Sequence, residues 1–126
     1  MNLLLDTHCL IWALTDAPQL GQTARRAIAA AASVWFSEVS IWELGLKWRK
    51  GKIALQPRRI VEQALRDRFR PLPITLEAIL LSSELRHKHG DPFDRLLYAQ
   101  ARENDCRLLA IDRTLAEFGA RVLRPK

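Results

Sequence analysis

Residues 2–14 read NLLLDTHCLIWAL, and this stretch decides the fold. Asn2–Leu5 is an apolar run with the length of a buried strand. Thr7–Leu14 follows at once as a helix, which stops at the turn around Asp16-Ala17-Pro18. Asp6 stands at the junction between the two, so a charged side chain is expected at the end of a buried strand.

The same alternation of strand and helix continues along the chain. Further strands are expected at Val34–Phe36, Leu72–Ile74, Arg107–Ile111 and Arg121–Leu123. Further helices are expected at Gln22–Ala32, Glu38–Lys50 with Gly51 as its cap, Pro57 to about Phe69, Leu76–His87, Pro92–Asn104 and Thr114–Phe118. This pattern predicts an α/β fold with three α/β/α layers and a mostly parallel central sheet. No linker divides the chain, so residues 1–126 are expected to form a single domain.

Composition excludes several classes of protein. The chain has 126 residues, of which 48% are hydrophobic, and this fraction argues against disorder. Two cysteines, Cys9 and Cys106, imply no disulfide framework. The first six residues lack the basic region of a signal peptide, and no apolar run approaches the ~20 residues of a transmembrane helix. We therefore expect a soluble protein of the cytoplasm, with no membrane association.

Positive charge is concentrated in one part of the chain. Residues 45–70 carry nine basic and two acidic side chains, a net +7, although the whole chain is only +6. The basic ones are Lys47, Arg49, Lys50, Lys52, Arg58, Arg59, Arg66, Arg68 and Arg70. Such a stretch indicates a polyanionic partner, with nucleic acid as the first candidate and an anionic membrane surface as the second.

Four acidic residues occupy positions that suggest a shared site. Asp6 and Asp112 each end a predicted strand, and the carboxyl ends of parallel strands lie at the same edge of a sheet. Asp94 falls in the first turn of a predicted helix, and Glu43 lies in the middle of another. Clustered carboxylates repel one another unless a cation neutralises them, and Mg²⁺ or Mn²⁺ is the natural oxygen-bound ion. Beside a basic surface, such a metal site is suited to phosphodiester hydrolysis.

Each acid also has a purely structural explanation. Asp6 and Asp112 are suitable N-caps for the helices that follow them. Asp91, just before Pro92, is a strong N-cap, and Asp94 three residues later resembles the acid of a capping box. Glu43 and Lys47 have the spacing of a surface ion pair on a helix.

The chain resembles the PIN-domain ribonucleases of the VapC type, the toxins of toxin–antitoxin pairs. The resemblance spans nearly the whole chain in order. The matching segments are Leu4-Leu5-Asp6-Thr7-His8, residues 37–44 (SEVSIWEL) running on to Lys47 and Gly51-Lys52, residues 91–101 (DPFDRLLYAQA) and residues 108–112 (LLAID).

The resemblance implies a PIN-like fold and a metal-dependent endoribonuclease. Asp6, Glu43, Asp94 and Asp112 would ligate one or two Mg²⁺ or Mn²⁺ ions, and a metal-activated water would attack the RNA phosphodiester in line. The products would carry a 5′-phosphate and a 3′-hydroxyl. Thr7 would add a hydroxyl through a water, whereas Ala110 stands where relatives often carry Ser or Thr. A VapB-like antitoxin, with a basic side chain reaching the carboxylates, and a homodimer are the implied partners.

Two other functions remain open at this point. A receiver-type phospho-acceptor domain is also small, α/β and Mg²⁺-binding, but it requires an acceptor aspartate at the end of a middle strand. A non-catalytic nucleic-acid-binding protein would explain the positive charge but would leave the acids without a role.

Tryptophan residues are the remaining candidates for base stacking. Trp12 and Trp42 fall in apolar stretches and are expected in the core. Trp48, between Lys47 and Arg49, is the better candidate for contact with RNA or a partner.

Overall fold

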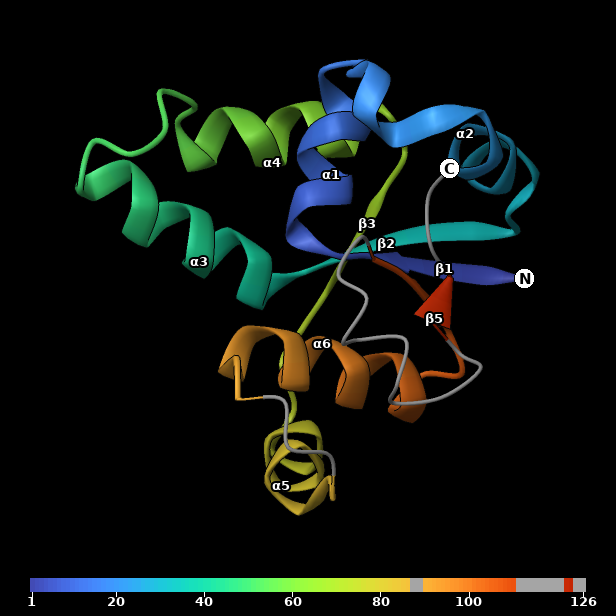
Figure 1. The fold of residues 1–126 in the computed structure, drawn as a ribbon, viewed down its shortest axis with the longest axis vertical. Helices are drawn as coiled ribbons and strands as arrows, with labels where there is room; N and C mark the ends of the chain where they lie inside the picture. Colours follow the sequence, from blue (N-terminus) through green and yellow to red (C-terminus); the bar gives the residue numbers. More distant parts are fainter. Residues whose placement is uncertain (87–89, 111–121, 124–126) are drawn as a thin grey trace.

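The computed structural model describes residues 1–86, 90–110 and the short strand at 122–123. Its strands are β1 (Asn2–Leu5), β2 (Ser33–Ser37), β3 (Arg70–Leu72), β4 (Arg107–Leu109) and β5 (Val122–Leu123). Its helices are α1 (Thr7–Leu14), the 3-10 turn η1 (Pro18–Leu20), α2 (Gly21–Ala30), α3 (Glu38–Arg49), α4 (Pro57–Arg66), α5 (Leu76–Glu84) and α6 (Pro92–Glu103). All paired strands are parallel, in the order β3-β2-β1-β4-β5 (Figure 1). The expected α/β fold with a parallel sheet is confirmed.

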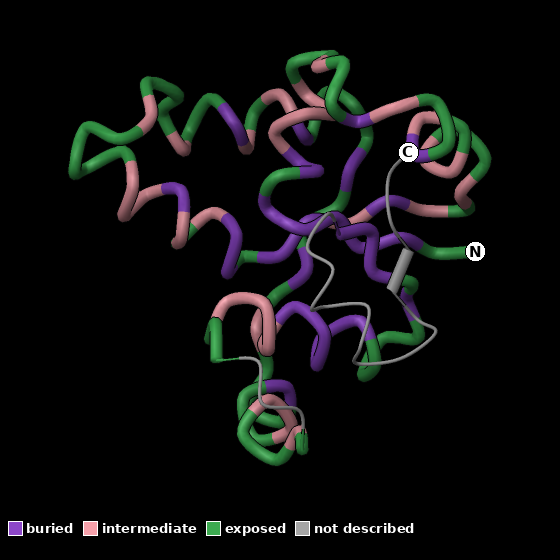
Figure 2. The backbone as a smooth tube through the Cα atoms, viewed as in Figure 1, coloured by how far each residue is buried: buried purple, intermediate pink, exposed green. Residues whose placement is uncertain are grey.

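Alternating side chains of the strands divide the core in two. Leu5 pairs in register with Leu109 of β4, and both belong to the cluster covered by α1, α2 and α4. Leu4 pairs with Leu108, and both belong to the cluster covered by α6. This period of two follows from the pleat of a strand, which points successive side chains to opposite faces. The sheet is therefore the middle of three layers, and the buried residues line its two faces (Figure 2).

Helix α3 lies at the carboxyl edge of the sheet, between the two layers. It begins directly after β2, where the Ser37 hydroxyl accepts the Val39 N–H at 3.0 Å as a helix cap. Its Leu44 belongs to the first core cluster and its Val39 to the second. Helix α5 packs on the outer side of α6 (Figure 1).

Strand β3 differs from its predicted position. It occupies Arg70–Leu72 and not Leu72–Ile74, because Arg70 pairs with Trp35 of β2 and places its guanidinium 5.6 Å from the centre of that ring. Pro71 lacks an N–H but is tolerated, since β3 is an edge strand.

Several helix ends also differ from the predictions. Helix α2 begins and ends slightly earlier than expected, α4 ends at Arg66 and not near Phe69, and α5 ends at Glu84. The turn η1 was not anticipated. The predicted helix Thr114–Phe118, residue 87 of the predicted helix Leu76–His87, residue 111 and residue 121 lie outside the described residues.

Four helices end with a residue of positive φ. These residues are Asp16, Gly51, Arg68 and Asp105, with φ of 53°, 72°, 65° and 52°. In each case the next residue donates its N–H back into the last turn, as Phe69 does to the Ala64 carbonyl at 2.9 Å. Gly51 was identified from the sequence as a cap of this kind, because glycine adopts this conformation without strain.

Strand order excludes the receiver-type alternative. Receiver domains have the order 2-1-3-4-5, whereas here β2 and β3 both lie on one side of a central β1. In the described part of the chain, no helix combines the length and apolarity needed to cross a lipid bilayer.

Candidate active site

Asp6 is held at the carboxyl end of the central strand. Its N–H donates to the Leu109 carbonyl of β4 at 2.9 Å, and its side chain is buried, with only 3% of the residue exposed. Its Oδ1 accepts the Cys9 N–H at 2.7 Å, so the N-cap interpretation is confirmed. A carboxylate has several lone pairs, so a carboxylate that caps a helix can also ligate a cation.

Cys9 behaves as a structural residue beside Asp6. Burial raises the pKa of the Cys9 thiol far above its usual range, and the charge and hydrogen bond of Asp6 raise it further. The thiol therefore stays protonated and cannot act as a nucleophile. This agrees with the sequence, which offers no partner that would activate it.

Glu43 is tied to the residue that follows Asp6. Thr7 Oγ1 lies 2.7 Å from Glu43 Oε1 and 2.9 Å from Ser40 Oγ, and both Thr7 and Ser40 are buried. A carboxylate only accepts, so the Thr7 proton goes to Glu43 and the Ser40 hydroxyl donates to Thr7. In the structure the Thr7 hydroxyl therefore bonds directly to the Glu43 carboxylate.

Lys47 contacts the other oxygen of the same carboxylate. Its Nζ lies 3.4 Å from Glu43 Oε2, one helical turn along α3, which confirms the expected ion pair. Only 15% of the Glu43 side chain is exposed, compared with 38% of that of Lys47. Glu43 thus carries a hydrogen bond on one oxygen and a positive charge near the other.

Asp94 reaches this edge of the sheet from α6. Asp91 caps that helix, and its Oδ1 accepts the N–H groups of Phe93 at 2.9 Å and of Asp94 at 3.2 Å. The N-cap interpretation of Asp91 is therefore confirmed. Asp94 is half-buried in the first turn, and the neighbouring Phe93 ring contacts Trp42 of α3 with ring centres 5.5 Å apart.

A buried polar bridge that sequence reasoning missed fixes α6 against β2. The Ser37 hydroxyl donates to Gln100 Oε1, and Gln100 Nε2 donates to the Pro73 carbonyl at 3.2 Å. Gln100 and Ser37 are both fully buried. A glutamine among Leu97, Tyr98 and Ala101 on the apolar face of a helix was the available signal, because a buried amide must find partners.

The candidate acids have the oxygen ligands that suit a hard divalent cation, although the described ones do not form a metal-binding cluster. Asp6 caps α1, Glu43 lies on α3 and Asp94 lies on α6, and α3 packs against both of the other helices. Their carboxylate oxygen atoms are the ligands that Mg²⁺ and Mn²⁺ prefer. Within residues 1–86 and 90–110, no three His, Cys, Asp or Glu side chains form a cluster that could hold an ion. Asp112 lies outside the described residues.

Lysine residues line a cavity beside Glu43. A cavity of about 310 Å³ is lined by Glu43, Leu46, Lys47, Lys50, Lys52, Asp91 and Phe93. The first part of the basic segment therefore lies against the carboxylates. A polyanion that enters this cavity would meet three ammonium groups next to the acidic side chains.

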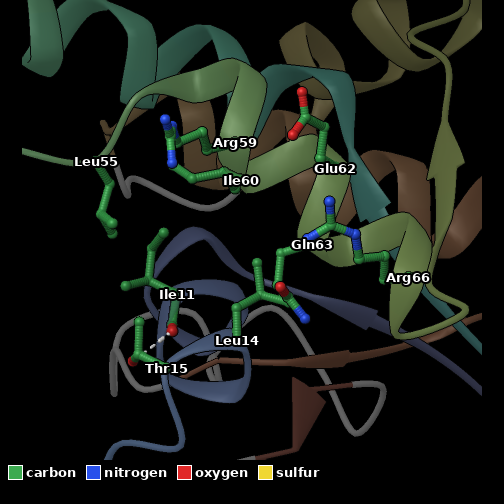
Figure 3. Close-up of a pocket in the computed structure, with 9 residues that line it drawn as sticks. All are labelled: Ile11, Leu14, Thr15, Leu55, Arg59, Ile60, Glu62, Gln63 and Arg66. Atoms are coloured by element: carbon green, nitrogen blue, oxygen red, sulfur yellow. Dashed lines mark hydrogen bonds between the residues drawn. The ribbon is translucent and has the colours of Figure 1, made fainter.

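A second cavity separates α1 from α4 (Figure 3). It also measures about 310 Å³, and Ile11, Leu14, Leu55 and Ile60 give it apolar walls. Arg59, Glu62 and Arg66 of α4 also line it, so it combines apolar walls with two positive charges and one negative charge (Figure 3).

Comparison with known proteins places the chain among PIN domains. The model of the PIN domain family matches residues 3–120. Ribonuclease VapC22 of Mycobacterium tuberculosis is 33% identical over 119 residues, which cover 90% of this chain and 89% of that protein. Among solved structures, VapBC2 of Rickettsia felis, bound to a DNA fragment from its promoter, aligns with a TM-score of 0.71 at 15% identity, over 98% of this chain and 97% of the other.

A second solved structure has a similar fold. The Mycobacterium tuberculosis toxin VapC20, described as cleaving the sarcin–ricin loop, aligns with a TM-score of 0.66 at 21% identity. The alignment covers 98% of this chain and 99% of VapC20. At these identities the solved structures establish the shared fold, and the sequence match supplies the family.

Proposed function

The chain belongs to the PIN domain family, and we propose that it is an endoribonuclease, the toxin of a toxin–antitoxin pair. The observation that carries this proposal is the lysine-lined cavity that also contains Glu43 and Asp91. Phosphodiester hydrolysis requires positive charge to hold the backbone and acids to hold a metal, and both stand at one edge of the sheet. The relative named ribonuclease VapC22 supports the same activity.

Asp6, Glu43, Asp94 and Asp112 are the residues that would hold Mg²⁺ or Mn²⁺. When bound, such an ion lowers the pKa of a water and neutralises charge on the phosphate. The chain itself prepares the ligands, because the N-terminus of α1 fixes Asp6 and the Thr7 hydroxyl orients Glu43 Oε1. Lys47 neutralises Glu43 when no ion is present. Ala110 offers no hydroxyl, whereas Thr7 and Ser40, among the described residues, place hydroxyl groups behind Glu43.

Substrate binding is assigned to the basic segment. Lys50 and Lys52 line the cavity together with Lys47, which pairs with Glu43, and a polynucleotide backbone would supply negative charge to Lys50 and Lys52. The non-catalytic alternative, a protein that only binds nucleic acid, would leave the arrangement of Thr7, Ser40 and Glu43 without a purpose. The two buried free cysteines suit the reducing cytoplasm.

A VapB-like antitoxin is the proposed partner. Solved relatives of this fold include toxin–antitoxin complexes from Klebsiella pneumoniae and Rickettsia felis. We expect a segment of the antitoxin to cross the acidic edge and place an arginine against Asp6, Glu43 and Asp94. Apolar side chains of the same segment would enter the cavity between α1 and α4, where Arg59 and Arg66 would pair with its acids. The toxin itself is expected to form a homodimer.

The decisive experiment is sequencing of RNA ends after expression of the wild type and of Asp94→Asn. New ends with 5′-phosphates in the wild type and none in the variant would support the proposal. Asp67→Asn is the matched control, because Asp67 is an exposed carboxylate at the end of α4. Cleavage by purified protein that persists in EDTA would refute metal dependence. RNA binding without any cleavage would favour the non-catalytic alternative.

A further inference from the structure

Trp42 stands at the surface, contrary to its expected place in the core. The residue is 61% exposed, and it lies on α3 directly before Glu43. A single exposed aromatic ring is ordinary, so its position matters more than its exposure. Phe93, the ring it contacts, lies directly before Asp94 on α6. The pair therefore stands beside two of the candidate metal ligands.

The contact between the two rings leaves the indole available. Their planes meet at 67°, with one ring approaching through its edge, so the rings do not stack face to face. The exposed fraction of Trp42 agrees with this arrangement, since Phe93 cannot cover both faces of the indole. A flat aromatic surface thus remains open beside the acids.

Positive charge adjoins this aromatic pair. Phe93 lines the cavity of about 310 Å³ that Lys47, Lys50 and Lys52 also line. Bases and phosphates alternate along a single-stranded nucleic acid, so it presents a flat ring and a negative charge in turn. Proteins that bind such strands without sequence preference combine basic grooves with aromatic platforms. Charge also favours this occupant over a second copy, because the chain itself carries +6.

We propose that Trp42 is a stacking platform for an unpaired nucleobase beside the bond that is cut, and that Lys50 and Lys52 hold neighbouring phosphates. The proposal rests on the proposed ribonuclease function and adds a base-stacking residue to it. A base in a double helix is stacked on both sides and cannot cover the indole. Trp42 would therefore contact the RNA at an unpaired nucleotide.

The test measures binding in EDTA, where cleavage does not interfere. Fluorescence anisotropy compares a labelled single-stranded oligoribonucleotide with an oligomer of the same length and charge that carries no bases. Trp42→Ala should weaken binding of the first by about fivefold or more, the expected effect of one stacked base, and leave binding of the second unchanged. Trp42→Phe should retain most of the affinity.

Two further variants separate stacking from charge. Leu76→Ala is the control, because Leu76 is a large apolar side chain on α5 that is 72% exposed and does not line the cavity. It should change neither affinity. The double variant Lys50→Gln, Lys52→Gln should weaken the binding of both oligomers equally. It should also reduce the slope of log affinity against log salt concentration by about 0.7 for each phosphate that is no longer neutralised.

The outcomes distinguish this inference from the proposed function. If Trp42→Ala changes both affinities equally, or neither, in a wild type that binds and cleaves RNA, the stacking platform is refuted and the nuclease stands. If the wild type neither binds the oligoribonucleotide nor cleaves RNA with Mg²⁺, the proposed function fails as well. A dimer that dissociates in Trp42→Ala while RNA affinity is unchanged would assign Trp42 to an interface between copies.

Discussion

The bond from Thr7 to Glu43 gives the most direct test of how the site is built. Thr7→Val keeps the shape of the side chain and removes the hydroxyl. Glu43 Oε1 then loses a donor at 2.7 Å, and the buried Ser40 hydroxyl loses the acceptor that lay 2.9 Å away. We expect lower stability together with lower activity.

The expected cost comes from the two bonds. A hydrogen bond to a charged group contributes about 1.5–3 kcal/mol, and an unpaired buried hydroxyl costs about 1–3 kcal/mol. Glu43 recovers part of this loss, since 15% of its side chain is exposed and Lys47 remains beside it. A net loss of about 2 kcal/mol follows, which corresponds to a fall in Tm of about 7 °C for a chain of this length.

Thermal unfolding in EDTA measures the stability term, and a cleavage assay on single-stranded RNA measures kcat and KM. We expect kcat to fall by about tenfold or more, because a Glu43 carboxylate that is no longer oriented by Thr7 would bind the metal less well. KM should change little. Thr7→Ser retains the hydroxyl and should preserve kcat. Thr15→Val is the matched control, since the Thr15 hydroxyl at the other end of α1 is exposed and water can replace its bond to the Ile11 carbonyl. A Tm unchanged in Thr7→Val, or kcat equal in all three variants, would refute the positioning role.

Three further predictions concern charge and backbone. Asp94→Asn should abolish cleavage but leave Tm in EDTA equal or higher, because repulsion between carboxylates is relieved; loss of stability with activity retained would return Asp94 to a structural role. Replacing Arg58, Arg59 and Arg66 with Gln should reduce the salt slope of RNA binding by about 0.7 for each phosphate that the arginines neutralise, and an unchanged slope would leave α4 for a protein partner. Arg68→Gly should raise the free energy of unfolding, measured by chemical denaturation, by about 1 kcal/mol, because Arg68 has φ of 65°. A lower free energy of unfolding in this variant would show that the arginine side chain stabilises the fold by more than the backbone strain costs.

Local sequence signals predicted the order of elements well and their ends less well. Strand β1 and helix α1 have the predicted bounds, because an apolar run and a strong cap mark both. The predicted end of α4 was too late in the sequence. The helix ends at Arg66 because Arg68 adopts a positive φ, which arginine normally disfavours. The backbone bond from Phe69 to Ala64 and the burial of Phe69 supply the stabilisation, and neither can be seen in the sequence.

The candidate acids could be named from the sequence, but their hydrogen bonds could not. Thr7 and Glu43 are far apart in sequence, so their bond depends on how α3 packs against α1. Trp42 was predicted to be buried because its neighbours in sequence are apolar. Successive residues of a helix are about 100° apart around its axis, however, so neighbours in sequence face different sides. Val39, Ser40 and Leu44 form the buried side of α3, and Trp42 lies on the opposite one. Helical phase, applied to that segment, would have corrected the prediction.

The order of strands has a consequence for the cell that synthesises this protein. Strand β1 is central, and its two neighbours are made at very different times, β2 at residues 33–37 and β4 at residues 107–109. A nascent chain released before residue 92 lacks α6, so Leu4 and Val39 have no cover and Asp94 does not yet exist. The translating ribosome, itself largely RNA, therefore makes an incomplete nuclease until the last third of the chain has emerged. Premature termination therefore yields an incomplete fragment and not an active nuclease.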